Sequence, residues 1–568
     1  MSLHDDNKQG LIEWCKRGEP MIWLNAAAVT VSTMAVIGLL LLLAVRGFGH
    51  FWPASVVQAE YNLPSETAVP ILAERVEVES VPIEQLLSAG FKIDASEPFV
   101  KRELVKVGNR DVGGADFKWV ISDYLEDVQY PRDVLVIERR EWGNFYGFLQ
   151  EVKEQGKVVA NTEADGPAAL LDFQARVERA SEIHDRIAKI EKKDIGSINY
   201  KLEKLRLKER GLSLDDDLSA ASRQERETEI ALSRAELDIQ YKALQAQLAE
   251  LYTQWNRDSY TILTSSGQLR EQRMATVVKA YQPNAMHIGQ KIVFYFQKFG
   301  EFLTEEPREA NTEGGIFPAI FGTVIMVLIM SVLVTPFGVI AAVYLREYAK
   351  QGLMTRIVRI AVNNLAGVPS IVYGVFGLGF FIYFLGAEMD KAMFAEALPA
   401  PTFGTPGLLW ASVTLALLTL PVVIVATEEG LARIPRNLRE GSLALGATKA
   451  ETLWRVVLPM ASPAMMTGLI LAVARAAGEV APLMLVGVVK LAPSLPVDGN
   501  FPYFHLDQKF MHLGFHIYDV GFQSPNVEAA RPLVYATALL LVVIIALLNL
   551  SAVALRNRLR EKYKSLEM

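Results

Sequence analysis

Two charged side chains stand inside a long apolar stretch in the last third of the chain. Arg475 and Glu479 lie in the run 463–488, which is otherwise mostly apolar. A spacing of four residues places both side chains on one face of a helix. A charge near mid-membrane costs roughly 3 kcal/mol on insertion scales, so such residues normally face a protein interior or a pathway. The pair predicts an anion contact in a translocation path, with Arg475 as the attractive charge and Glu479 as its partner or gate. The alternative is a structural ion pair that only locks the helix.

A polar segment, 428–462, leads directly into this stretch and has a regular spacing of its own. Its marked residues are Arg439, Glu440, Gly441, Ser442, Gly446, Ala447, Val456, Leu458 and Pro459. The pattern predicts a helix from about Arg436 to Leu445, a turn at Gly446-Ala447, and a second helix from Lys449 to Val457. Small side chains here allow another surface to approach the backbone closely, while Arg433, Arg436 and Arg439 are expected to face water. The alternative is an ordinary loop held on its side of the membrane by positive charge.

Composition indicates a membrane core joined to a sizeable water-exposed part. Of 568 residues, 51% are hydrophobic, and the net charge of −7 gives no reason to expect nucleic acid as a partner. The one cysteine, Cys15, precludes a disulfide within the chain. We expect no cleaved signal peptide, because the first apolar run is long and lacks a small-residue cleavage site. The sequence has no Gly-x4-Gly-Lys-Ser/Thr loop, so we expect no ATPase activity and no cofactor in this chain.

Six apolar runs are long enough to cross a bilayer. They cover 21–45, 316–343, 357–385, 408–427, 463–488 and 533–555. Lys and Arg near the short loops fix the orientation, because cytoplasmic loops carry the excess of positive charge. This rule predicts a multi-pass membrane protein with the N-terminus 1–20, the segment 428–462 and the tail 556–568 in the cytoplasm. The interval 46–315 and the loop near 490–532 then face outward.

Two of these runs contain helix breakers. Thr335-Pro336-Phe337-Gly338 interrupts the second run, and the stretch 363–370 with Gly367 and Pro369 interrupts the third. Backbone groups freed by Pro or Gly in a membrane are satisfied by protein or by a water-filled path, although small residues also serve tight helix packing. Asn363, Asn364 and Ser370 are the candidate pathway residues.

The interval 46–315 is predicted to form an α+β domain with a helical hairpin. The parts 46–165 and 258–300 contain strand-like runs, at 117–121, 134–137 and 292–296. Between them, about 168–257 is helical and charged, and its apolar residues alternate spacings of four and three, as in a coiled coil. Gly211 and the acidic run 215–217 mark the expected tip. No His/Cys/Asp set has convincing metal-ligand spacing, and His505, His512 and His516 are expected to be surface histidines in a loop.

The spacing in 440–459 resembles the E-A-A-x3-G-x9-I-x-L-P signature of permease subunits in bacterial ABC importers. Gly replaces the first Ala, Ser the second Ala, and Val the Ile. Other segments resemble the PstA subunit of the phosphate-specific importer over about 314–560. They are Gly314-Gly315-Ile316, 338–345, Gly367-Val368-Pro369-Ser370, Gly478-Glu479-Val480-Ala481-Pro482-Leu483 and Leu555-Arg556-Asn557-Arg558. The long interval 46–315 departs from the short hydrophilic loop of typical members.

This resemblance implies a polytopic α-helical membrane protein, a type I ABC importer permease with a MetI-like core over 316–555. It implies a second permease subunit of the PstC type, two PstB-type ATPase subunits that use ATP and magnesium, and a periplasmic phosphate-binding protein. It assigns Arg475 and Glu479 to phosphate passage and 440–459 to ATPase docking. A sulfate or molybdate permease of the same architecture is one alternative. The other is a membrane-anchored sensor or scaffold that uses the coiled coil.

Overall fold

The computed structural model describes residues 16–63, 67–88, 98–215, 218–524 and 527–563. Six helical segments in this part of the chain are long and apolar enough to cross a membrane, as predicted. The first is α2 (Glu19–Gly49), and the second is α10 (Phe317–Val343) with a π-helical end, Tyr344–Tyr348. The third joins α12 (Ser370–Phe376), a π-helix (Gly377–Gly386) and α13 (Ala387–Met393). The fourth is α14 (Leu408–Arg433), and the sixth is α20 (Val527–Tyr563).

The fifth span begins in the polar segment that precedes it. Its parts are α16 (Lys449–Thr452), a π-helix (Leu453–Val457) and α17 (Leu458–Ala477), which follow one another without a break. The predicted end at residue 488 is wrong. The helix stops at Ala477, and only a short helix, α18 (Leu483–Val486), follows. Gly478 and Pro482 explain this end, because Gly favours helix termination and Pro cannot continue a helix.

The third span is also shorter than predicted. Residues 353–365 form a separate helix, α11 (Leu353–Leu365), and the chain is non-helical at Val368 and Pro369 before α12 begins. Pro369 removes a backbone donor and disfavours helical geometry in the residue before it. The breakers in 363–370 therefore end a helix, whereas Pro336 lies inside the continuous helix α10.

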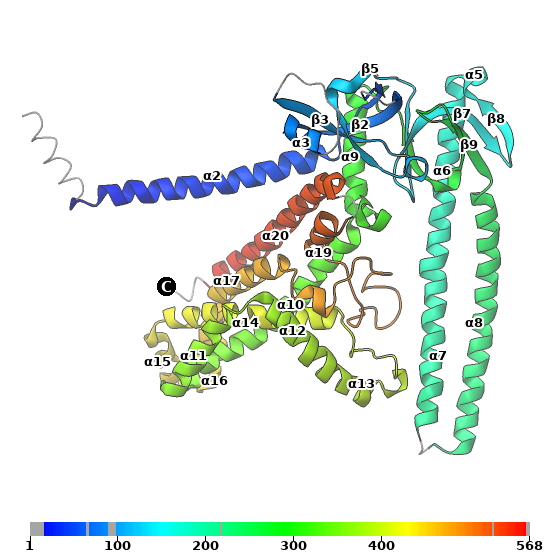
Figure 1. Ribbon diagram of the computed structural model, residues 1–568. Coiled ribbons are helices and arrows are strands. Elements are labelled where there is room, and N and C mark those ends of the chain that lie inside the picture. The colour runs from blue at the N-terminus through cyan, green and yellow to red at the C-terminus, as the bar shows by residue number, and fades with distance from the viewer. Residues whose placement is uncertain (1–15, 64–66, 89–97, 216–217, 525–526, 564–568) are drawn as a thin grey trace, which may run out of the picture.

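The spans pack around α14, the most buried of them. Met326 and Met330 of α10, Leu415 of α14 and Ala472 of α17 are fully buried in one apolar core. Small residues bring α14 and α17 together: a Cβ on Gly430 would lie 2.5 Å from the Ala464 Cβ, and one on Gly468 would lie 2.6 Å from the Ala426 Cβ. By contrast, α2 stands apart, and none of its most apolar window is buried. Figure 1 shows it meeting the rest of the core only at the start of α20.

The two ends of this core differ, and we name them by what they carry. The loop end holds α11, α15 (Arg436–Ala444) and the last turns of α20. The insert end holds the domain between the first two spans and the chain 478–512 (Figure 1). Residues 1–15 and 564–568 of the predicted terminal segments, and 216–217 of the predicted hairpin tip, lie outside the described residues.

The inserted domain contains two antiparallel sheets. The first has the order β4-β3-β2-β1-β5, from Phe117–Ile121, Phe99–Lys106, Val69–Pro82, Val56–Tyr61 and Leu125–Gln129. The second has the order β10-β9-β7-β6-β11, from Leu269–Arg273, Asp258–Leu263, Phe145–Glu154, Leu135–Arg139 and Val277–Tyr281, with β8 (Lys157–Asn161) on β7. The strand-like runs at 117–121 and 134–137 thus fall in or beside β4 and β6.

The run 292–296, predicted to be a strand, is helical. It lies in α9 (Ile288–Thr304), which connects the second sheet to the second span. The reason is visible over a longer window: Ile288, Ile292, Tyr295, Phe299 and Phe302 recur at spacings of four and three, which is the period of a helix. This period outweighs the strand preference of the β-branched and aromatic residues within the run.

Two long antiparallel helices project from the second sheet. One side is α6 (Pro167–Lys189), a π-helical turn (Ile190–Ile195) and α7 (Gly196–Leu214), and the other is α8 (Ala220–Trp255). Ile183, Ile187 and Ile190 pack against Leu248 and Leu251 near the base. Figure 1 shows this hairpin running from the sheets along the insert end of the core.

Candidate functional site

The polar segment that resembles the permease signature forms the predicted helix–turn–helix. Helix α15 ends at Ala444, and Gly446 makes the turn with a φ of 89°, in the region that favours glycine. Thr448 then caps α16 with a capping box, in which its side chain accepts from the Glu451 amide and the Glu451 side chain accepts from the Thr448 amide. The hydroxyl groups of Ser442 and Thr452 lie 2.9 Å apart and hold the two helices together.

The outer surface of this segment is open and partly apolar. Glu440, Gly441 and Gly446 are exposed, and a Cβ on either glycine would meet nothing within 4 Å. Leu445 is 91% exposed and Trp454 is 74% exposed, the former more than any other large apolar side chain in the described part of the chain. Ala447 closes the turn through its amide to the Ser442 carbonyl, while Leu458 and Pro459 begin α17. A surface of this kind marks a protein contact more often than a solvated loop.

Arg439 does not face water, contrary to the prediction for this arginine. Its guanidinium lies 3.0 Å from the Glu347 carboxylate at the π-helical end of the second span, and it donates to the Leu431 carbonyl at 2.7 Å. Arg433 and Arg436 are exposed, as predicted. Lys449 donates to the Glu347 carbonyl and lies 4.5 Å above the Tyr348 ring. Two cations, Arg439 and Lys449, therefore tie the loop to the second span. The sequence shows their positive charge but not these contacts.

A second ion pair joins α11 to the fourth span at the same end. Arg359 lies 3.2 Å from Glu428 and donates to Gln351 at 2.9 Å and to the Leu345 carbonyl at 3.2 Å. Leu345, Arg359, Asn363 and Glu428 are among the residues that line a cavity of about 120 Å³. No local pattern in the sequence connects Arg359 with Glu428, because they come from different helices.

Arg475 and Glu479 are brought together, but not by one helix face. Because α17 ends at Ala477, Glu479 lies in the turn beyond the helix, and its carboxylate is 3.6 Å from the Arg475 guanidinium. Both side chains are partly buried, at 32% and 19% exposure. The Gly478 and Glu479 amides close the helix end by donating to the Arg475 and Ala476 carbonyls at 3.3 and 3.2 Å, so the position combines a cation and an anion at a capped helix end.

The candidate pathway residues separate into two places. Helix α12 packs beside the segment after α17, since a Cβ on Gly374 would lie 2.7 Å from the Pro482 Cα. Ser370 begins this helix, one turn before Gly374. Tyr373, on the same helix, is close enough to Arg475 to feel its charge, and its hydroxyl donates to the Leu365 carbonyl at 2.6 Å. Asn363 and Asn364 lie at the end of α11, on the other side of the break.

The three histidines near the last span are buried, so their assignment to the surface is wrong. His505, His512 and His516 are 7%, 1% and 2% exposed. His505 lies 2.8 Å from Asp498, and His512 accepts from the Gly514 amide at the start of α19 (Leu513–Tyr518). Burial lowers the pKa of His512 to about 3 and that of His516 to about 4. The histidines are buried because the chain around them is a folded, partly apolar segment at the insert end and not a solvated loop.

Buried polar groups connect three segments around His516. Asp519 is 1% exposed and lies 3.1 Å from the Lys490 ammonium and 3.2 Å from the Asn311 amide nitrogen. The same Asn311 amide donates to the Lys490 carbonyl at 2.9 Å. The chain before the second span, the chain after α17 and the chain before α20 are thereby fixed to one another.

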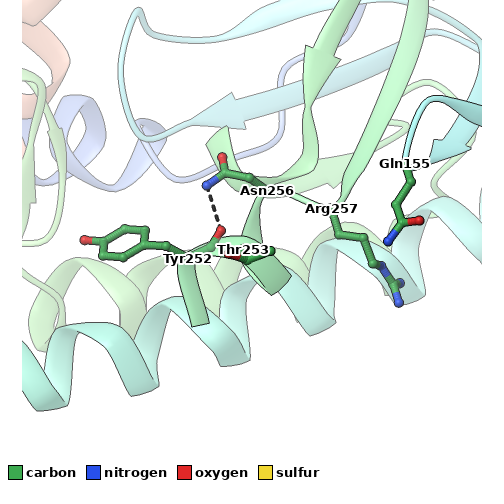
Figure 2. A pocket seen from close by; sticks show the side chains of 5 residues that line it. All are labelled: Gln155, Tyr252, Thr253, Asn256 and Arg257. Atoms are coloured by element: carbon green, nitrogen blue, oxygen red, sulfur yellow. Dashed lines mark hydrogen bonds between the residues drawn. The ribbon is translucent and has the colours of Figure 1, made fainter. Parts of the chain in front are cut away.

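A separate pocket of about 490 Å³ lies at the base of the hairpin. Gln155, Tyr252, Thr253, Asn256 and Arg257 line it (Figure 2). Arg257 is engaged by Asp258, which also accepts from Arg176 and Arg179 at 3.0 and 2.8 Å. Because Asp258 is only 4% exposed, this cluster fastens the hairpin to the sheet.

Comparison with known proteins places these features in a family. Residues 334–562 match the family model described as the binding-protein-dependent transport system inner membrane component. The chain is similar to the phosphate transport system permease protein PstA 1 of Mycobacterium tuberculosis (strain CDC 1551 / Oshkosh), with 36% identity over 43% of this chain and 71% of the relative. It is also similar to the phosphate transport system permease protein PstA of Mycobacterium leprae, with 36% identity over 43% of this chain and 71% of that relative.

A solved structure of the MetNI methionine ABC transporter in an inward-facing conformation is also similar, at 19% identity and a TM-score of 0.31. The match covers 42% of this chain and 94% of that one. Three observations lead to one assignment: the extent and identity of the match to the curated relatives, the six spans, and the helix–turn–helix between the fourth and fifth spans. The chain belongs to the PstA-type family of multi-pass membrane permeases, with a MetI-like core and a large domain inserted between its first and second spans.

Proposed function

We propose that this chain is the transmembrane permease subunit of an ATP-driven importer that moves inorganic phosphate from the periplasm to the cytoplasm. The observation that carries the proposal is the helix–turn–helix at 436–457. It is exposed at Leu445 and Trp454, yet tied to the second span through Arg439 and Glu347. Such a segment can receive a push from another protein and pass it to the spans. A purely anchoring scaffold would need neither property.

The identity of the substrate is supported by the relatives and by charge. The relatives are named as phosphate transport permeases. Arg475 supplies a cation at a helix end inside the core, and Glu479 balances it when no anion is bound. An oxyanion that displaces the carboxylate would gain a charge-assisted contact with a guanidinium, which suits planar or tetrahedral anions through its several donors.

The assembly follows from this role. A second permease of the PstC type would complete the path, and a pair of PstB-type ATPase subunits would bind ATP and magnesium in the cytoplasm. A periplasmic phosphate-binding protein would deliver the anion. In this arrangement the protein lies in the bacterial inner membrane, with the loop end and both termini in the cytoplasm and the insert end in the periplasm. The excess of Lys and Arg near the loop end supports this orientation.

The experiment is uptake of labelled phosphate by vesicles that contain the whole assembly. We expect Arg475→Ala to reduce uptake at least tenfold and Arg475→Lys to retain part of it. Arg531→Ala is the matched control, because Arg531 is half exposed at the insert end and pairs with Glu77 at 3.7 Å. Unlabelled sulfate and molybdate distinguish a phosphate importer from another oxyanion permease by competition. Uptake that survives Arg475→Ala unchanged would remove this residue from the path.

A further inference from the structure

We propose that α9 lies in the membrane interface, with its apolar side in the lipid of the leaflet at the insert end. Four large apolar side chains of this helix have no protein cover: Ile288, Val293 and Phe296 are 66–68% exposed, and Ile292 is 45% exposed. Spacings of four, five and eight residues from Ile288 place them on one side of the helix. A contiguous exposed face of this kind marks an interaction surface.

The opposite side of α9 is fixed to the second sheet, so the helix cannot turn its apolar face inward. Phe294 is buried, and its ring lies 4.5 Å from that of Tyr281 in β11. Lys298 pairs with Glu138 of β6, and Glu301 pairs with Lys279 of β11 at 2.7 Å. Charged groups on the sheet side and apolar groups on the exposed side are the arrangement of an amphipathic helix at a membrane surface.

The apolar face continues into an aromatic cluster at the end of the first span. Phe51, just after α2, contacts Tyr295, Phe299 and Phe302 at ring distances of 6.2, 5.4 and 5.1 Å. Trp52 contacts Tyr295 at 6.3 Å and is 41% exposed, and Phe48 in the last turn of α2 is 44% exposed. Aromatic side chains at a span end mark the boundary between hydrocarbon and headgroups.

This continuity identifies lipid as the occupant. Figure 1 shows α9 crossing the ends of α2 and α20 instead of running along them, as a helix parallel to the membrane surface would. Phe48 lies at the end of the first span and is 44% exposed, so its open side would lie in the lipid of this leaflet. The same lipid would reach Ile292 and Phe296, whose burial in hydrocarbon is favourable. The inserted domain would thus contact the membrane through α9 as well as through the two spans that flank it.

The test measures what surrounds each side of α9 in the assembled transporter. A Cys15→Ser background removes the one native cysteine. Single cysteines at Ile292 and Phe296 probe the apolar side, and Gln247→Cys is the control, being an exposed residue of the hairpin helix α8. Each is labelled with a nitroxide in nanodiscs of phosphatidylethanolamine and phosphatidylglycerol, and collision with oxygen is compared with collision with a water-soluble nickel chelate.

We expect oxygen to exceed the nickel chelate several-fold at positions 292 and 296, and the order to reverse at 247. Equal access of the nickel chelate to all three positions would place the face in water and overturn the proposal. Protection of 292 and 296 from both reagents would mean that another protein covers the face, which also overturns it. Val293→Cys replaces either variant that does not assemble.

Discussion

The Arg439 guanidinium of α15 lies 3.0 Å from the Glu347 carboxylate at the end of the second span, and both side chains are mostly buried. This pair is the direct link between the exposed helix–turn–helix and the spans. Partly buried charges depend on each other more than surface charges do, because removing one leaves the other poorly solvated.

Removal of Arg439 should uncouple transport from ATP hydrolysis. For Arg439→Ala we expect uptake per ATP to fall about three- to tenfold, corresponding to a loss of about 1 kcal/mol in the link. Arg436→Ala on the same helix is exposed and should change little. The measurement is the ratio of phosphate uptake to ATP hydrolysis in vesicles. If Arg439→Ala and Arg436→Ala give the same ratio, the ion pair between Arg439 and Glu347 is not needed for coupling. The double exchange Arg439→Glu with Glu347→Arg should restore part of the coupling.

Gly446 should be required for its backbone conformation and not for space. An L-residue at its φ of 89° is strained by about 1–2 kcal/mol, although a Cβ would meet nothing within 4 Å. We therefore expect Gly446→Val to lower the thermal stability of the purified protein more than Gly446→Asn does. Gly441→Ala, in a helix with equally open space, should be neutral or stabilising, since Ala is the better helix former. Equal losses for Val and Asn would contradict the conformational explanation.

Asp258 should hold the hairpin to the sheet. Asp258→Asn removes the buried carboxylate that three arginines share and leaves Arg176 and Arg257 with the more exposed Glu154. We expect hydrogen exchange and proteolysis to increase in 167–255 while the spans stay protected. Glu209→Gln is the control, because its pair with Arg234 is exposed on both sides. Exchange that rises equally in both variants would show that the cluster has no special role.

Stability should decrease as the pH falls from about 6.5 to about 4. Burial lowers the pKa of His516 to about 4 in the folded protein, below the ordinary value of 6.5, so the unfolded chain binds a proton more readily in this window. The full stability is present above pH 6.5, and up to about 3 kcal/mol is lost on reaching pH 4. Neither ring nitrogen of His516 has a hydrogen-bond partner in the described part of the chain, so His516→Phe should fold and show a flatter dependence. The readout is the unfolding temperature against pH; parallel curves for both proteins would exclude His516 as the cause.

The core was largely predictable from the sequence, because apolar length and positional spacing are local properties. The six spans, the helix at 436–444 and the turn at Gly446 required only residue type and period. Span ends were less predictable: Pro369 and Gly478 were visible, but only the structure shows that each ends a helix where the hydropathy continues. The strand assigned to 292–296 failed for a related reason, since five residues are too short to reveal the period that defines α9.

The contacts that join distant segments were not predictable. Glu347 and Arg439 lie 92 residues apart, and Arg359 and Glu428 lie 69 apart, so no local pattern pairs them. The burial of His512 and His516 likewise depends on residues from other elements. A single sequence records the charges but not which of them meet.

The hairpin also touches the chain that follows the fifth span. The Tyr200 hydroxyl of α7 donates to the Phe501 carbonyl, and the Lys204 ammonium lies 3.2 Å from the same oxygen and 5.1 Å above the Phe501 ring. The hairpin is therefore attached to the sheet at its base through Asp258 and contacted along its length by Phe501. A displacement of Phe501 would rotate the hairpin about its base, and the end of the hairpin far from the sheet would move further than Tyr200.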